Sequence, residues 1–364
     1  MANHDYISRV LQNKRELSMN RKFFVRSMLP AVVLFLAGCK SAPTTPSEKF
    51  TMRVGYFPNI THSQALIGVA RGDFQKALGD NVTLQTTVFN AGPSVIEALF
   101  AGQIDLSYIG PNPAINGYIQ SDGKALRIIA GATSGGAAFI VRPAANIKTA
   151  ADLAGKKLAT PQLGNTQDVA LRGYLAEHGL KTEEQGGDVE VVPTDNASIL
   201  DLFRLGKIDG AWVPEPWASR LIIDGGGSLF LDERDLWTET DGQFTTAVII
   251  VDTKFLAAHP DAVKAWLRAH IEITQWELEN PGDAQTLMNA QIQKLTGKAL
   301  SSDVLSMAWG RMKPTWDPIS ASLTKSAQSA FEAGFLKTKP DLSGINDLTV
   351  LNQVLKEKGL TQVK

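Results

Sequence analysis

Small polar residues occur in four turns, each placed where an apolar run ends and a helical pattern begins. The turns are FPNITHS, NAGPSV, GPNPA and PQLGNTQD, and the candidate binding residues in them are Asn59, Thr61, His62, Gly92, Pro93, Ser94, Gly110, Asn112, Asn165, Thr166 and Gln167. Such residues cap helices and leave backbone N–H groups free to bind a ligand. Each helix N-terminus carries about half a positive charge, so several converging termini would hold a small oxyanion without Lys or Arg. Ordinary capping of four unrelated helices is the alternative.

Aromatic residues supply a second candidate feature, because they fall at strand ends or in the adjacent turns: Tyr56, Phe57, Tyr108, Trp212 and Trp217. Core packing is the commoner role of aromatic side chains. Trp217 follows a Pro turn, where its ring would wall an organic tail. Glu215 beside it would accept a hydrogen bond from a ligand amine or, alternatively, stand as a solvated carboxylate at the rim.

Enzyme motifs are absent from the sequence. The five histidines show no H-E-x-x-H pair, and there is no P-loop, no G-x-G-x-x-G and no G-x-S-x-G elbow. His62, next to the candidate anion site, would tune affinity with pH or serve as a structural histidine. We therefore expect a protein that is not an enzyme and that holds neither a cofactor nor a metal.

Composition describes a globular chain of ordinary make-up. Its 364 residues suffice for two domains, 44% are hydrophobic and 20% are charged. The formal net charge of −1 argues against a nucleic-acid partner. A charged ligand would be held by local dipoles and side chains.

Short apolar runs alternate with helical patterns from residue 50 onward, which is typical of βαβ units. Strands are expected at 51–57, 82–89, 106–109, 126–130, 189–192, 211–213, 228–231 and 245–251. Helices are expected at Ser63–Ala77, Ser94–Ala101, Pro113–Gln120, Thr166–Glu177, Ser198–Leu205, Pro216–Ile223 and Pro260–Glu279. The helical C-terminal tail is expected to lie on the first of two lobes.

An internal repeat indicates two lobes of similar topology. GQIDLSYIGPNPA begins at Gly102 and GKIDGAWVPEPWA begins at Gly206, and each follows a similar helix. In both copies a helix ends at glycine, and a Pro-rich turn after a short strand begins the next helix. We expect lobe I at 51–141 and 246–364, lobe II at 142–245, and hinges at the crossings near residues 141 and 246. Chance similarity of two common helix–strand units is the alternative.

The N-terminus resembles an export signal. Three basic residues between positions 21 and 26 precede an apolar run from Met28 to Gly38. This run is too short to span a bilayer, which needs about 20 residues, but it suits a signal peptide. We expect residues 1–38 to be the signal peptide, with Met19 as an alternative start.

The segment LAGC resembles the lipobox of bacterial lipoproteins and contains Cys39, the single cysteine of the chain. The resemblance implies cleavage before Cys39 and lipid on its thiol. Residues 39–50 would form a lipidated, flexible tether, so that an exported protein is held at a membrane by lipid alone. A buried apolar segment with a stray cysteine is the alternative.

Several motifs in one order resemble the sulfonate/nitrate/taurine-type solute-binding proteins of ABC importers over residues 50–280. They are VGYFPNITHSQALIGVARG, NAGPSVIEALFAGQIDLSYIGPNPAI, TPQLGNTQDVALRGYLAEHG and WVPEPWASRL. The resemblance implies an α/β, two-lobed periplasmic-binding-protein fold of type II, with parallel-rich sheets flanked by helices and two hinge crossovers. It also implies that the candidate turns, together with Glu215 and Trp217, line the solute site.

The expected function is that of an extracytoplasmic, monomeric solute-binding lipoprotein. It would close on a small oxyanionic solute and deliver it to an ABC permease with its ATPase. The aromatic residues favour an aliphatic sulfonate or a sulfate ester; nitrate, bicarbonate or a thiamine precursor is the alternative within the family. A sensing lipoprotein without a transporter stays open, as does an enzyme on the same fold, although thiamine-pyrimidine synthases use a cysteine-rich stretch that this chain lacks.

Overall fold

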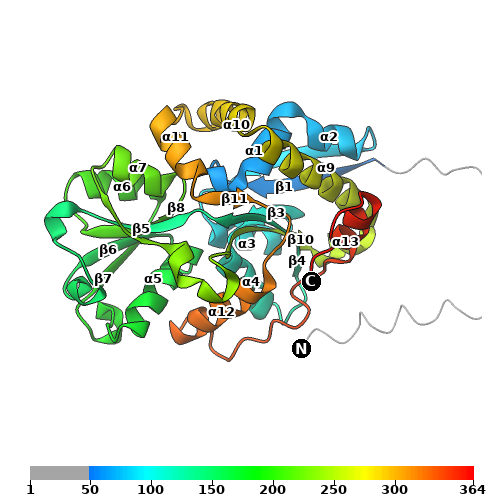
Figure 1. Cartoon of the computed structure of the whole chain (residues 1–364). Coiled ribbons are helices and arrows are strands. Elements are labelled where there is room, and N and C mark those ends of the chain that lie inside the picture. Colours follow the sequence, from blue (N-terminus) through cyan, green and yellow to red (C-terminus); the bar gives the residue numbers. More distant parts are fainter. Residues whose placement is uncertain (1–48) are drawn as a thin grey trace, which may run out of the picture. The chain divides into compact units, whose positions relative to one another are not determined.

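Two mixed β-sheets organise residues 49–364, the part of the chain that the computed structural model describes (Figure 1). The predicted signal peptide, Cys39 and most of the tether lie outside the described residues. The strands of the first sheet are β1 (Phe50–Tyr56), β2 (Val82–Val88), β3 (Leu106–Ile109), β4 (Leu126–Gly135), β10 (Thr245–Asp252) and β11 (Met312–Pro314). Those of the second sheet are β5 (Ala137–Val141), β6 (Lys157–Pro161), β7 (Glu190–Thr194), β8 (Gly210–Pro214) and β9 (Ser228–Asp232).

The two sheets have the same strand order. The first runs β2-β1-β3-β10-β4 with β11 at the edge beside β4, and the second runs β7-β6-β8-β5-β9. In each, the first three strands in this order are parallel, whereas the strand that arrives from the other sheet, β10 or β5, is antiparallel to both neighbours. The predicted α/β two-lobed fold with parallel-rich sheets is confirmed: β1, β2, β3 and β4 run in one direction, as do β6, β7, β8 and β9, and the crossing strand makes each sheet mixed.

Helices flank both sheets, and the predicted helix at Ser63–Ala77 is interrupted at Gly72, whose φ of 74° is left-handed. The α-helices are α1 (Ser63–Arg71), α2 (Asp73–Leu78), α3 (Gly92–Phe100), α4 (Pro111–Gln120), α5 (Thr166–Glu177), α6 (Asn196–Arg204), α7 (Trp217–Ile223), α8 (Thr253–Ala258), α9 (Pro260–Glu279), α10 (Pro281–Thr296), α11 (Ser302–Trp309), α12 (Ser320–Glu332) and α13 (Thr349–Glu357). Short 3-10 helices are η1 (Ile60–His62), η2 (Pro143–Ala145), η3 (Ala150–Leu153), η4 (Glu183–Gln185), η5 (Glu233–Leu236) and η6 (Thr238–Thr240). Within residues 49–364, no helix is both long enough and apolar enough to cross a membrane.

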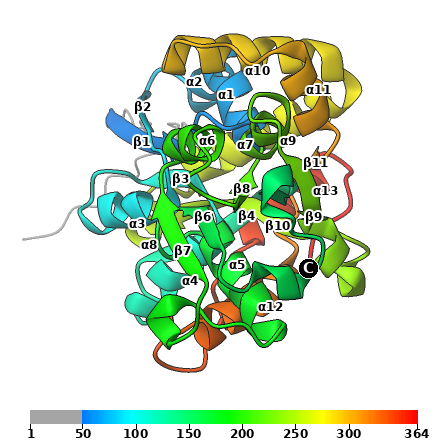
Figure 2. The ribbon, with the colours of Figure 1, turned by 90° about the vertical axis from the view of Figure 1, so that its left-hand side faces the viewer.

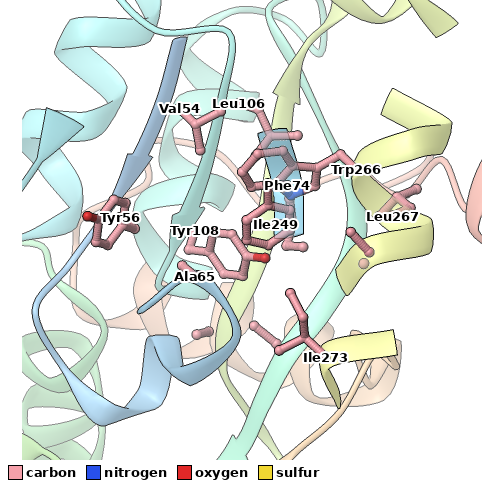
Figure 3. Close-up of a cluster of buried hydrophobic side chains, with 14 of the residues drawn as sticks. Val54, Tyr56, Ala65, Phe74, Leu106, Tyr108, Ile249, Trp266, Leu267 and Ile273 are labelled. Carbon is pink, nitrogen blue, oxygen red and sulfur yellow. The ribbon is translucent and has the colours of Figure 1, made fainter. Parts of the chain in front are cut away.

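A hydrophobic core lies between the first sheet and α9 (Figure 3). Trp266 stacks on Phe74 with ring centroids 3.7 Å apart, and Leu267 and Ile273 of the same helix belong to this core. Tyr108 is fully buried and its hydroxyl lies 3.0 Å from Nδ1 of His270. Burying each large apolar side chain contributes about 1.5–3 kcal/mol, so this face anchors the sheet.

The C-terminal segment touches both halves of the described structure. Strand β11 joins the first sheet, and α9 packs on α1 and α2. However, α11 also contacts α7, and α12 packs on both α4 and α5 (Figure 2). The tail therefore bridges elements that belong to different sheets.

The chain passes from the first sheet to the second at Gly135 and Gly136, between β4 and β5, whereas the sequence analysis put this crossing near residue 141. Both glycines are left-handed, with φ of 71° and 81°. A Cβ on Gly135 would lie 2.7 Å from the carbonyl oxygen of Arg311, and Gly136 donates its N–H to the same oxygen. The return passage lies between β9 and β10.

Candidate functional site

A cavity lies where the parallel strands of both sheets end. Within residues 49–364, its lining residues follow the carboxyl ends of β1, β2, β3, β6, β7 and β8, apart from Thr246 on β10. The lining comprises Phe57, Asn59, Thr61, His62, Asn90, Gly110, Asn165, Thr166, Gln167, Asn196, Pro214 and Thr246. This is the position at which open α/β sheets bind ligands.

The first-sheet wall is built around His62. Its ring stacks on Phe57 with centroids 4.4 Å apart, and its Nδ1 accepts a hydrogen bond from the Phe57 N–H at 3.2 Å. Burial lowers the pKa of His62 to about 3, so the imidazole is neutral. Because Nδ1 accepts, the proton is on Nε2. His62 therefore provides no positive charge for an anion.

The second-sheet wall is the N-terminus of α5. Asn165 caps this helix by accepting the N–H of Thr166 at 2.8 Å. Asp168, which is fully buried, accepts the N–H of Gly164 at 2.9 Å and the hydroxyl of Thr160 at 2.8 Å. Burial raises the pKa of Asp168, although these hydrogen bonds and Arg172 oppose that shift. The turn before α5 is thus held in one conformation.

Thr166 contains the clearest sign of a missing partner. Its side chain is buried, yet Oγ1 makes no hydrogen bond. It faces Gly110 at the start of α4, where a Cβ would lie only 2.4 Å from Oγ1. The side-chain oxygen of Asn196, at the start of α6, also lacks a partner. Buried polar atoms are normally paired, so these two atoms point to a polar ligand in the cavity.

The cavity has no charged lining residue among the described part of the chain. Its donors are hydroxyls, carboxamides, one neutral imidazole and the first turns of helices such as α4 and α5. Such a set suits a small anion held by dipoles. The cavity volume is about 20 Å³, slightly more than a single water molecule requires, so the present conformation admits only a compact group.

Of the predicted binding residues, the cavity gathers Asn59, Thr61, His62, Gly110, Asn165, Thr166 and Gln167. The α3 turn contributes Asn90 in place of its three predicted residues. Gly92 packs so closely on Pro113 that a Cβ would lie 2.3 Å away, and Pro93 faces a surface groove. Ser94, inside α3, does not line the cavity.

Asn112 and Trp217 lie away from this cavity. Asn112 donates to the Ser326 carbonyl at 3.1 Å and faces a second cavity, beside α12. Trp217 donates from Nε1 to Oδ1 of Asn59 at 3.2 Å, across the two halves of the structure. Trp217 therefore positions a lining residue and does not itself wall the cavity.

The prediction for Glu215 is wrong in both of its forms. Its side chain is fully buried, and its carboxylate accepts hydrogen bonds from the Ser219 hydroxyl at 2.9 Å and from Nη1 of Arg311 at 3.1 Å. Burial raises its pKa, with these partners opposing the shift. Because its oxygens are already bound, Glu215 is a structural carboxylate near the Gly135–Gly136 passage, neither a solvated rim residue nor an acceptor for a ligand amine.

Sequence reasoning missed four lining residues, Asn90, Asn196, Pro214 and Thr246, whereas Phe57 was among the aromatic candidates. The internal repeat contained a signal for two of them. Gly102 and Gly206 are equivalent, and the same spacing pairs Gly92 with Asn196 and Gly110 with Pro214. Thr246 comes from the crossing strand, and no local motif marks it.

Comparison with known proteins confirms the predicted resemblance. The model of the NMT1-like family matches residues 45–291, more than half of the chain. The taurine-binding periplasmic protein of Escherichia coli K12 is 28% identical over 213 residues, which cover 58% of this chain and 63% of that protein.

Two solved structures share the fold. The alkanesulfonate-binding protein SsuA from Xanthomonas axonopodis pv. citri, bound to MOPS, superposes with a TM-score of 0.69 at 20% identity, covering 83% of this chain and 99% of that one. The periplasmic nitrate-binding protein NrtA from Synechocystis PCC 6803 superposes with a TM-score of 0.70 at 17% identity, covering 85% and 89%. The chain therefore belongs to the NMT1-like family and has the two-lobed periplasmic-binding-protein fold.

Proposed function

We propose that this protein is an extracytoplasmic solute-binding lipoprotein of an ABC importer and that it captures a small oxyanionic solute in the cavity at the strand ends. The single observation that carries the proposal is the unpaired, buried hydroxyl of Thr166 at the N-terminus of α5. Burying a hydroxyl removes its hydrogen bonds to water, and this costs free energy unless the protein or a ligand supplies a new hydrogen bond.

Neutral donors and helix termini account for the preference for an anion. A carboxylate in the lining would repel an oxyanion, and the cavity contains none among the described residues. Each helix N-terminus contributes about 0.3–1 kcal/mol toward a negative charge, and more when partly buried. Several termini meet here, so their contributions combine on one bound group.

The favoured solute is an aliphatic sulfonate or a sulfate ester. The names of the taurine-binding and alkanesulfonate-binding relatives support a sulfonate. The cavity volume of about 20 Å³ favours a second candidate, a compact anion such as nitrate or bicarbonate. An organic solute needs additional room for its tail.

Closure of the two lobes is the proposed capture step. Residues from both sheets line the cavity, so a bound solute would stabilise the arrangement in which they meet. The hydrogen bond from Trp217 to Asn59 joins the same two halves. The closed surface would then be recognised by a permease and its ATPase, while lipid on Cys39 keeps the protein at the membrane.

Calorimetric titration with methanesulfonate, longer alkanesulfonates, a sulfate ester, nitrate and bicarbonate tests the solute class. Thr166→Val should weaken binding of the best solute by about tenfold or more, because a hydrogen bond to a charged group is lost. Thr349→Val is the matched control, since Thr349 is also the first residue of a helix but is exposed on α13. No binding by any anion, or equal affinity in the two variants, would remove the cavity from this role.

The anchor is tested separately. Cys39→Ala should yield an exported protein that metabolic labelling with a fatty acid no longer marks. Persistent labelling of the variant would refute lipidation at Cys39.

A further inference from the structure

A second cavity, of about 80 Å³, adjoins the first between α5, α12 and η5. Thr166 lines both cavities, so its unpaired hydroxyl stands at their junction. Figure 2 shows α12 beside α5. Helix α12 lies outside residues 45–291, so the family match does not include this wall.

Glu233 is the notable residue of the second cavity. It is the first residue of η5, and only 3% of its surface is exposed. Its Oε2 accepts a hydrogen bond from Nε1 of Trp212 at 2.8 Å. Trp237, from the same loop, also lines the cavity. Trp212 presents its N–H edge to the carboxyl and Lys325 covers the Trp237 ring, so the carboxyl itself is the group that would attract a cation.

The ionisable groups around Glu233 are mostly engaged with other partners, and Lys325 offsets its charge only in part. Lys325 of α12 lines the cavity, but its Nζ pairs with Glu239 at 2.9 Å, donates to the Leu236 carbonyl at 2.8 Å and lies 4.7 Å from the Trp237 ring. Glu177 lines the cavity from an exposed position at the end of α5. Asp232, next to Glu233, is already paired with Arg234 at 2.7 Å. Glu233 is thus the buried carboxyl of this cavity that has no ion-pair partner among residues 49–364.

We propose that this second cavity, called here the tail cavity, binds a protonated amine at the end of the solute's chain, with Glu233 as its acceptor. The inference rests on the proposed function, because the solute's oxyanion would occupy the first cavity. Its substrate class is an oxyanion joined by an aliphatic chain to an ammonium group. The amine acceptor that the sequence placed at Glu215 is thereby assigned to Glu233.

The first experiment compares two probes of equal length by calorimetry. Butanesulfonate and 4-aminobutanesulfonate carry the same oxyanion and differ only in the terminal group. We expect the amine to bind about tenfold more tightly. If both four-carbon probes bind equally, the tail cavity has no role in selection while the proposed function stands. If neither binds, the proposed function itself fails for sulfonates.

Protonation gives a readout that needs no variant. Burial raises the pKa of Glu233 to about 7, so the carboxyl holds a proton in part of the molecules at neutral pH. An ammonium group that binds the carboxylate expels this proton, and titrations in buffers of different ionisation enthalpy should show proton release for 4-aminobutanesulfonate. Butanesulfonate should release none. Equal release with both probes would contradict the assignment.

Glu233→Gln then separates recognition from structure, since the carboxamide oxygen still accepts from Trp212. The variant should lose the tenfold preference for the amine and the proton release, while its affinity for butanesulfonate stays unchanged. Glu272→Gln, exposed on α9, is the control and should retain the preference. An equal loss of affinity for both probes in Glu233→Gln would reduce Glu233 to a structural role and overturn the proposal.

Discussion

The two sheets repeat one design closely enough to compare residue by residue. Asp105 accepts the backbone N–H of Arg53 on β1 at 2.7 Å, and its equivalent Asp209 accepts the N–H of Lys157 on β6 at 3.0 Å. In the first sheet this aspartate joins the turn before β3 to β1, and in the second sheet it joins the turn before β8 to β6. The repeated G-x-I-D motif is therefore a device for joining two parallel strands.

The halves differ in the turn that follows this third strand. After β3, Gly110 leads directly into α4 and faces Thr166 in the cavity. After β8, Pro214 reaches the cavity, but the next residue, Glu215, turns away and bonds Arg311 beside the sheet-to-sheet passage. One turn is used for the candidate binding site and the other for holding the two halves together. A repeated backbone thus carries different side-chain chemistry.

The largest expected effect concerns the turn used for structure. Arg311→Met leaves the buried carboxylate of Glu215 without its cation and should lower the free energy of unfolding by about 3–5 kcal/mol. Arg234→Met, at a half-exposed pair with Asp232, should cost less than about 1 kcal/mol. Denaturant titrations of both variants measure the loss of unfolding free energy. Equal losses would show that the buried Arg311–Glu215 pair stabilises the protein no more than the half-exposed Arg234–Asp232 pair.

The shared aspartates allow a second comparison. Asp105→Ala should cost about 3 kcal/mol, because Asp105 is buried and also accepts from Nε of Arg53 at 3.0 Å. Asp209→Ala should cost about 1–2 kcal/mol, since its side chain is 25% exposed. Thermal and chemical unfolding of the two variants test this order, and a larger loss at Asp209 would reverse the assignment.

The buried carboxyl of Glu233 makes the free energy of unfolding depend on pH. The folded pKa of about 7 lies above the ordinary value of 4.5, so the folded state retains a proton that the unfolded state loses as pH rises. The contribution of Glu233 to stability is thus fully present below about pH 4.5 and is lost by about pH 7, a change of about 3 kcal/mol. Denaturation of the parent protein and of Glu233→Gln at several pH values should show this difference, and parallel curves would disprove it.

The smallest effect is expected at the binding turn. Gly110→Ala introduces a methyl 2.4 Å from Oγ1 of Thr166 and should lower solute affinity by about tenfold, because the two helix starts can no longer meet. Stability should change little, since Gly110 has an ordinary φ of −69°. Gly310→Ala is the control, because a Cβ there meets no atom closer than 3.6 Å. Unchanged affinity in both variants would mean that Gly110 does not govern closure.

Local patterns predicted much of the candidate site. The expected helix at Thr166–Glu177 matches α5, and the capping residues before it lie in the cavity. Capping depends on a few consecutive residues, so its chemistry is visible in the sequence. The turn before α3 was identified correctly, but the lining residue is Asn90, because close packing of Gly92 on Pro113 turns the next residues away.

The sequence alone determined most of the order of strands and helices, the internal repeat and the helix starts that gather polar residues, since all of these depend on periodicity and on neighbours along the chain; the bounds of β5, β6 and β11 were not predicted. Only the tertiary structure decided that Glu215 pairs with Arg311, that Thr246 reaches the cavity, and that α12 and Glu233 build a second cavity beside it. Those roles depend on contacts between segments far apart in the sequence. Which residues pack against a buried carboxyl then decides whether that carboxyl has an ion-pair partner.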